Sequence, residues 1–107
     1  LDNWLRDLTE LKVGDPVELN MAHTLMQNPD VSAVTLVDVI VFRDAAEARD
    51  DVALWAHELK HVEQYRQLGV DLFAARYARD YRALEAPAYQ LQGQVRQALK
   101  ARAVARQ

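Results

Sequence analysis

The chain has 107 residues, of which 50% are hydrophobic and 27% charged, so we expect a single folded domain over residues 1–107 rather than a disordered chain. The net charge of −3 gives no positive surplus, which argues against nucleic acid as a partner. No unbroken apolar run approaches the roughly 20 residues of a membrane helix, so we expect no membrane segment. Cysteine is absent, which excludes disulfides, thiol nucleophiles and cysteine-ligated metal.

The first third of the chain predicts two short helices and a turn. Leucines recur about three residues apart over residues 2–13, and Gly14 follows, as is typical at the end of a helix. Pro16 suits the first helical position, so residues 17–26 form the second expected helix. Residues 28–30 read Asn-Pro-Asp, a turn signal.

Residues 32–42 are dense in valine, isoleucine, threonine and phenylalanine, which predicts one or two β-strands. Because this is the only strongly β-like stretch, the sheet must be small and must leave an exposed edge. We expect Val39–Phe42 to supply that edge and to align an extended substrate by strand addition.

A long helix is expected after the strands. Asp50 or Asp51 suits its N-cap, and it should run to Leu68 and stop at Gly69. Three apolar residues at helical spacing predict its core-facing stripe: Trp55, Leu59 and Val62.

Further helices are expected to follow this one. Asp71 can cap the next, whose expected apolar face is Leu72, Phe73, Tyr77 and Tyr81. Because proline disrupts a helix interior, Pro87 predicts a new helix starting near Leu84, which would place Glu85 in a first turn. This last helix should be polar, with a frayed end at Gln107.

The motif that carries chemistry is His57-Glu58-Leu59-Lys60-His61, inside the long helix. Residues four apart lie on one helical face, so His57 and His61 can bind one zinc ion. Glu58 is rotated by about 100° around the helix, which suits a general base acting on a zinc-bound water rather than a ligand. The pattern therefore predicts a metal site with Zn²⁺ as its cofactor.

A catalytic zinc normally has three protein ligands, so a third must come from another segment. The residues considered are Glu85, Asp80, Asp71 and His23, with Glu85 favoured because a helix N-terminus presents it rigidly. Glu85 could equally be an acid placed there by the helix dipole, and His23 a surface or core histidine. Gln64, one turn past His61, could support the site by hydrogen bonding. The four tyrosines are expected to pack as aromatics with hydroxyls at the surface.

The stretch from Ala56 to Gln64, followed by Gly69 and later by Glu85-Ala86, resembles the AHELxHVxQ…G…EA pattern of a bacterial zincin-like domain. That family is associated with extracellular contractile injection systems and polymorphic toxins. The resemblance covers about residues 33–89. Pro87 and Lys60 depart from the pattern without touching a ligand position. A metzincin is excluded because no third histidine follows His61 at the required spacing.

The resemblance implies an α+β, mainly helical, minimal zincin-like fold of the gluzincin type, with a small β-hairpin or edge strand packed on the active-site helix. It implies His57, His61 and Glu85 as metal ligands and Glu58 as the catalytic acid and base. It also implies a peptide or protein substrate, a larger protein or secretion-system partner, and an exported or secreted location.

The function we expect first is a zinc-dependent peptidase, which hydrolyses a peptide bond by a zinc-activated water with Glu58 as general base. Two other functions stay open. The first is a non-catalytic, metal-binding module that serves as a structural or delivery domain beside a larger partner, which the small size favours because little surface is left for a deep cleft. The second is a helical interaction domain in which the histidine motif is coincidental.

Overall fold

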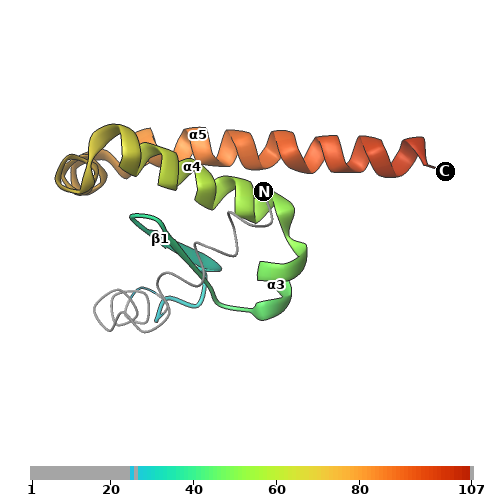
Figure 1. Ribbon diagram of the computed structural model, residues 1–107, viewed down its shortest axis with the longest axis horizontal. Helices are drawn as coiled ribbons and strands as arrows, with labels where there is room; N and C mark the ends of the chain where they lie inside the picture. Colours follow the sequence, from blue (N-terminus) through green and yellow to red (C-terminus); the bar gives the residue numbers. More distant parts are fainter. Residues whose placement is uncertain (1–24, 26, 107) are drawn as a thin grey trace.

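The computed structural model describes residue 25 and residues 27–106. The element order is β1 (Ala33–Leu36), β2 (Val39–Phe42), α3 (Ala45–Asp50), α4 (Val52–Leu68) and α5 (Val70–Ala105) (Figure 1). The mainly helical α+β fold with a small sheet is confirmed. The helices expected over residues 2–13 and 17–26, and His23, lie outside the described residues.

The sheet is a single antiparallel hairpin. Ala33 pairs with Phe42 and Leu36 with Val39, and a two-residue turn joins the strands. Val37 in this turn has φ of 61°, in the left-handed region that a β-branched side chain rarely adopts. Upstream, the turn expected at residues 28–30 is present, and the Asn28 side-chain oxygen accepts a hydrogen bond from the Asp30 amide.

Helix α4 has the expected ends. The Asp51 side chain accepts a hydrogen bond from the Leu54 amide at 2.9 Å, and Gly69 follows Leu68 with φ of 79°. The expected apolar stripe is only partly right, because Val62 is buried whereas Trp55 and Leu59 are half-buried. Most of the residues that α4 buries are polar: His57, Glu58, His61 and Gln64.

Helix α5 differs from the expected series of helices. It starts at Val70 rather than after an Asp71 cap, and its one non-helical residue is Asp80, with φ of −154° and ψ of 82°. The break therefore comes four residues before Leu84, and Pro87 lies inside the helix. Aspartate favours an extended backbone at a helix start, and the φ of proline suits a helix once the chain has turned. Of the expected apolar face, Phe73 is buried and the other three residues are exposed.

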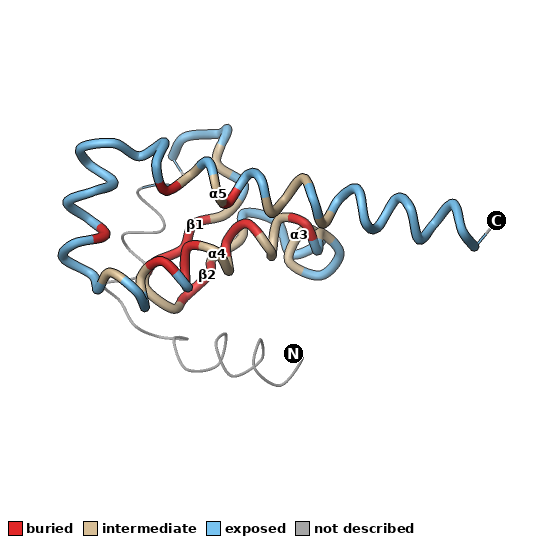
Figure 2. Tube along the Cα trace, turned by 90° about the horizontal axis from the view of Figure 1, so that it is seen from above, coloured by how far each residue is buried: buried red, intermediate tan, exposed pale blue. Residues whose placement is uncertain are grey.

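Helix α4 lies between the hairpin and α5 (Figure 1). Buried residues concentrate where these three elements meet, whereas the last turns of α5 extend beyond them and are exposed (Figure 2). Helix α3 contacts α4 and β2, and there the Trp55 indole N–H donates to the Ala48 carbonyl while its ring packs on Phe42. No helix in the part of the chain that the structure describes is both long and apolar enough to cross a membrane.

The backbone at Gly69 yields a first prediction. With φ of 79° and ψ of 162°, this residue occupies a region that is essentially restricted to glycine, so Gly69→Ala should lower the free energy of unfolding by about 1–3 kcal/mol. Gly93 is the matched control, because it is helical and a Cβ there would meet nothing within 4 Å. Gly93→Ala should be neutral or stabilising by up to about 1 kcal/mol. Urea denaturation of both variants tests this, and equal effects would contradict it.

Candidate metal centre

Helix α4 brings the three motif residues together on its buried side. The rings of His57 and His61 lie one turn apart with centroids separated by 5.0 Å. One ligand atom from each of His57, Glu58 and His61 lies within 4.8 Å of the others, so the three are close enough to hold a metal ion. All three are nearly inaccessible to solvent, which is unusual for side chains of this polarity.

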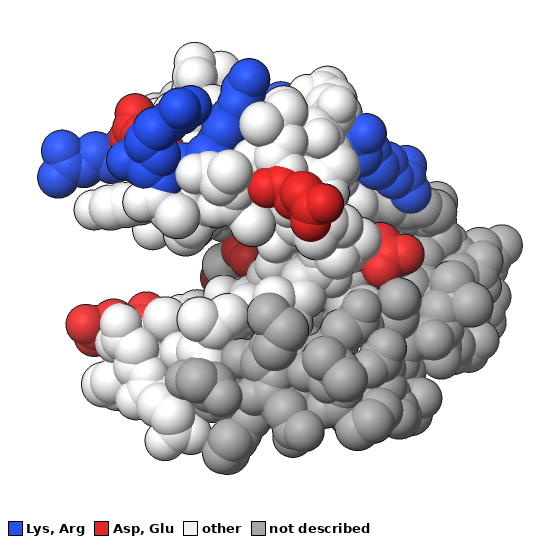
Figure 3. Space-filling model, turned by 90° about the vertical axis from the view of Figure 1, so that its left-hand side faces the viewer, with Lys and Arg blue, Asp and Glu red and all other residues white. Residues whose placement is uncertain are grey.

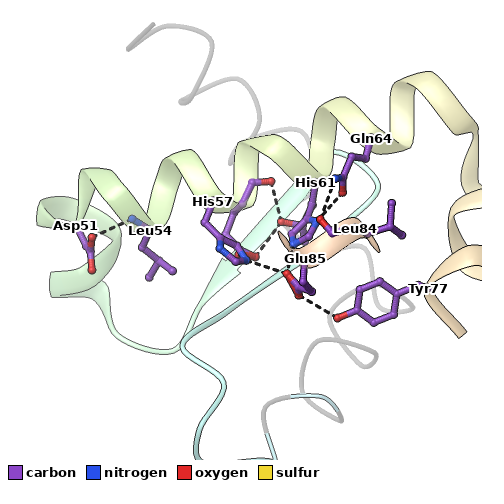
Figure 4. A network of polar contacts seen from close by, with 10 residues as sticks. Asp51, Leu54, His57, His61, Gln64, Tyr77, Leu84 and Glu85 are labelled. Carbon is purple, nitrogen blue, oxygen red and sulfur yellow. Dashed lines mark hydrogen bonds and ion pairs between the residues drawn. The ribbon is translucent and has the colours of Figure 1, made fainter. Parts of the chain in front are cut away.

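Glu85 reaches the two histidines from α5. Its Oε1 lies 3.0 Å from His57 Nε2 and 2.8 Å from His61 Nε2 (Figure 4). Of the other residues considered for a third ligand, Asp71 and Asp80 are exposed and neither has a contact with the histidines. The structure therefore brings together the two histidines and the glutamate that the sequence favoured.

The spacing of these atoms fits a metal ion. Two ligands at about 2.0–2.1 Å from one ion, at a tetrahedral angle, lie about 3.3 Å apart. The two contacts of Glu85 Oε1 are only slightly shorter, so a small separation of α4 and α5 would admit an ion. Glu58 is also close, but its Oε2 is 3.7 Å from His57 Nε2 and it bridges no pair of histidines. Glu85 Oε1, by contrast, lies within 3.0 Å of both histidine Nε2 atoms.

Gln64 sets the orientation of His61. Its amide oxygen lies 2.9 Å from His61 Nδ1, and its amide nitrogen donates to the Leu84 carbonyl at 2.9 Å. Because an amide oxygen only accepts, His61 Nδ1 carries a proton, and because Nε2 also donates to the Glu85 carboxylate here, Nε2 would have to lose its proton to bind a metal. The Leu84 contact also ties α4 to the residue next to Glu85.

His57 is held differently. Its Nδ1 is buried and has no hydrogen-bond partner among the described residues. The ring packs edge-on against Tyr89, with centroids 4.5 Å apart. Among the described residues, ring packing rather than a second hydrogen bond holds this histidine.

Tyr77 holds the other oxygen of Glu85. Its hydroxyl donates to Glu85 Oε2 at 3.1 Å, so the two carboxylate oxygens face different partners (Figure 4). Burial and the adjacent carboxylate raise the pKa of the Tyr77 hydroxyl. Tyr77 is thus a neutral donor at ordinary pH.

The charges of the cluster balance one another. Burial opposes ionisation of Glu85, but hydrogen bonds from His57 and His61 outweigh it and hold the pKa of this carboxyl well below its usual range. Burial also disfavours charge on His61, yet its hydrogen bonds to Glu85 and Gln64 raise its pKa. The pKa of Glu58 is raised, chiefly because this carboxyl is buried. The surroundings of Glu85 thus favour its ionised form, whereas those of Glu58 favour its protonated form.

A cleft of about 630 Å³ opens over the cluster, between β1, α4 and α5. Figure 3 shows it as a deep hollow with acidic side chains at its base. Strand β1 lines this cleft, and no residue of Val39–Phe42 does. The prediction that Val39–Phe42 would form the substrate-binding edge was therefore wrong. The hairpin turn places β2 on the side of β1 away from α4, toward α3.

Sequence reasoning missed Thr35. This residue lies on β1, and its hydroxyl is 3.2 Å from both the backbone oxygen and the Oε1 of Glu58. In the sequence, Thr35 looks like any other residue with high β-propensity in a strand, and nothing in its position relative to Glu58 indicates a contact.

A family model described as the eCIS core domain matches residues 15–69, just over half of the chain, so the chain belongs to the eCIS core domain family, which links it to extracellular contractile injection systems. The match includes the histidine motif and ends at Gly69, before Glu85. Comparison with curated proteins and with solved structures found no match.

Replacing both histidines should abolish metal binding. The His57→Ala, His61→Ala double variant keeps neither imidazole, so elemental analysis should find metal in the parent protein and none in the variant. Because metal binding contributes to folding free energy, a chelator should lower the melting temperature of the parent alone. Full metal occupancy in the variant would rule out this site.

Glu85→Ala should weaken metal binding by more than the roughly 10- to 100-fold that loss of a residue supporting a ligand typically costs. Glu63→Ala is the matched control, because Glu63 is an exposed carboxylate that contacts Lys60 and Gln67 rather than the histidines. A titration against a competing chelator compares both variants with the parent. Unchanged affinity in Glu85→Ala, or a selective loss in Asp80→Ala, would remove Glu85 from the ligand set.

Proposed function

We propose that this eCIS core domain is a zinc-dependent peptidase, formed as one domain over residues 1–107. His57, His61 and Glu85 are the metal ligands and Glu58 is the general base. The observation that carries the proposal is that the Nε2 atoms of both histidines contact the same oxygen, Glu85 Oε1. Glu58 lies beside them, with its Oε2 3.7 Å from His57 Nε2.

The donor set supports zinc. Two imidazole nitrogens and one carboxylate oxygen form the ligand set of many catalytic zinc sites, in which a fourth position stays open for water. The chain has no cysteine that would favour a closed, structural site. The cleft over the cluster gives a substrate access to that open position.

When bound, zinc supplies Lewis-acid chemistry that acidifies a water molecule and polarises a carbonyl group. Glu58 Oε2 accepts a proton from the attacking water and returns it to the nitrogen of the leaving amine. The raised pKa of Glu58 suits a group that must both accept and donate this proton. Glu85, with its lowered pKa, stays ionised throughout.

Strand β1 supplies the binding surface for an extended peptide. Its residues line the cleft, one of its edges pairs with β2, and the other edge has no strand beside it among the described residues, so a peptide can add there through backbone hydrogen bonds. The aromatic rings of Tyr77 and Tyr89 border the same cleft and can contact substrate side chains.

The alternative is a metal-binding module without catalysis, which acts as a structural or delivery domain beside an injection-system partner. Membership of the eCIS core domain family favours this reading, because it associates the chain with a larger assembly. Incubation with a mixed peptide library separates the two functions. Cleavage that a chelator stops and zinc restores supports the peptidase, whereas zinc-loaded protein that cleaves no peptide supports the module.

Glu58→Gln should keep zinc and lose peptidase activity. The amide preserves size and hydrogen bonding but cannot act as a base, so kcat should fall by a factor of about 10² or more. Glu63→Gln, the same change at an exposed position of α4, should leave kcat unchanged. Loss of zinc from Glu58→Gln would mean that Glu58 is a ligand instead.

A further inference from the structure

We propose that Thr35 is a positioning residue for Glu58: its hydroxyl holds one carboxylate oxygen so that the other faces the histidines. This inference rests on the proposed function, in which Glu58 is the general base. It concerns a residue of β1 that lies 23 positions before Glu58 and meets it only through the fold.

The contact is buried and specific. Thr35 is 9% exposed and Glu58 is 4% exposed. The Thr35 Oγ1 lies 3.2 Å from Glu58 Oε1, and no other side chain among the described residues donates a hydrogen bond to this carboxylate. Burying a carboxylate without a donor is costly, so this hydroxyl adds a hydrogen bond to the compensation that the nearby His57 and His61 provide.

The same hydroxyl lies 3.2 Å from the backbone oxygen of Glu58, although it has one proton to donate. A carbonyl inside a helix already accepts the amide hydrogen four residues ahead, whereas the carboxylate oxygen lacks another donor. The carboxylate is therefore the acceptor with more to gain, and Thr35 binds the side chain in preference to the backbone.

Fixing Oε1 determines where Oε2 points, because a carboxylate turns as one planar unit. Its terminal torsion is otherwise broad, so an unrestrained glutamate would sample many directions. With Oε1 on Thr35, Oε2 lies 3.7 Å from His57 Nε2, on the side of the proposed metal. Preorganisation of this kind lowers the barrier to proton transfer.

The position of Thr35 on β1 links the base to the substrate strand. The backbone oxygen of Thr35 accepts a hydrogen bond from the Tyr65 hydroxyl of α4 at 3.5 Å, which holds this part of the strand against the helix. A peptide that adds to the edge of β1 therefore lies beside the residue that orients Glu58. Thr35 links the strand to the base, through its backbone oxygen on Tyr65 and its hydroxyl on Glu58.

Kinetics test the inference first. Thr35→Val keeps the shape of the side chain and removes the hydroxyl, so kcat should fall by about 10- to 100-fold while KM and zinc affinity stay close to those of the parent. Thr35→Ser should restore kcat, and Glu63→Gln, a change at an exposed position of α4 outside the cleft, should leave kcat unchanged. If Thr35→Val unfolds, Thr35→Ala takes its place. Parental kcat in the valine or alanine variant overturns the proposal.

A double-mutant cycle tests the contact without requiring activity. The shift in urea midpoint caused by Thr35→Val is measured at saturating zinc, once in the parent and once in Glu58→Ala. It should shrink in Glu58→Ala if the hydroxyl acts on the carboxylate. An equal shift in both proteins would mean that Thr35 bonds only the backbone oxygen, which refutes the inference. A parent that is inactive on peptides refutes the peptidase, while the cycle still decides the role of Thr35.

Discussion

The convergence of two imidazoles from α4 on one carboxylate of α5 is the interaction on which the rest of this structure depends. Helix spacing alone brings His57 and His61 together, but Glu85 is 24 residues beyond His61 and meets them only because the chain turns twice, first at Gly69 (Figure 2). The break at Asp80 then redirects α5 before Glu85. Backbone conformations at these two residues are therefore part of the site.

The buried side of α4 is polar, which reverses the usual arrangement of an amphipathic helix. Each of its buried polar side chains has a partner on another element or on α4 itself: Thr35 for Glu58, Glu85 for both histidines, and Gln64 for His61. Most polar groups inside a protein are satisfied in this way, and among the described residues of α4 the exception is His57 Nδ1. The polar cluster therefore specifies how the hairpin, α4 and α5 must pack.

The features that the sequence predicted correctly are those that depend on neighbouring residues. The Asp51 cap, the Gly69 stop and the histidine spacing each depend on residues within one or two turns. Glu85 was chosen because it was expected in the first turn of a helix starting near Leu84, with support from the resemblance. No helix starts there, since the break is at Asp80, but Glu85 does lie against both histidines. The helix break was misplaced because proline is a stronger signal in sequence than the extended conformation of Asp80.

The remaining features depend on tertiary structure. The two-residue turn contains no glycine or asparagine, and Val37 adopts a left-handed backbone that its β-branched side chain disfavours. Because the sequence did not predict that turn, it could not show which of the two strands faces the cleft. Thr35 was invisible for the same reason, since its role comes from the strand that faces Glu58.

The hydrophobic core of the described residues is small, and Val62 is the largest side chain that is fully buried. The polar cluster that joins β1, α4 and α5 therefore also stabilises the fold, and under the proposed function a metal bound by two helices would contribute further to the folding free energy. Loss of a ligand would consequently reduce activity whether or not the metal takes part in catalysis. Glu58 and Thr35 are the informative positions, since neither belongs to the proposed ligand set and both lie beside it. Their variants separate a peptidase from a domain that only needs its metal to fold.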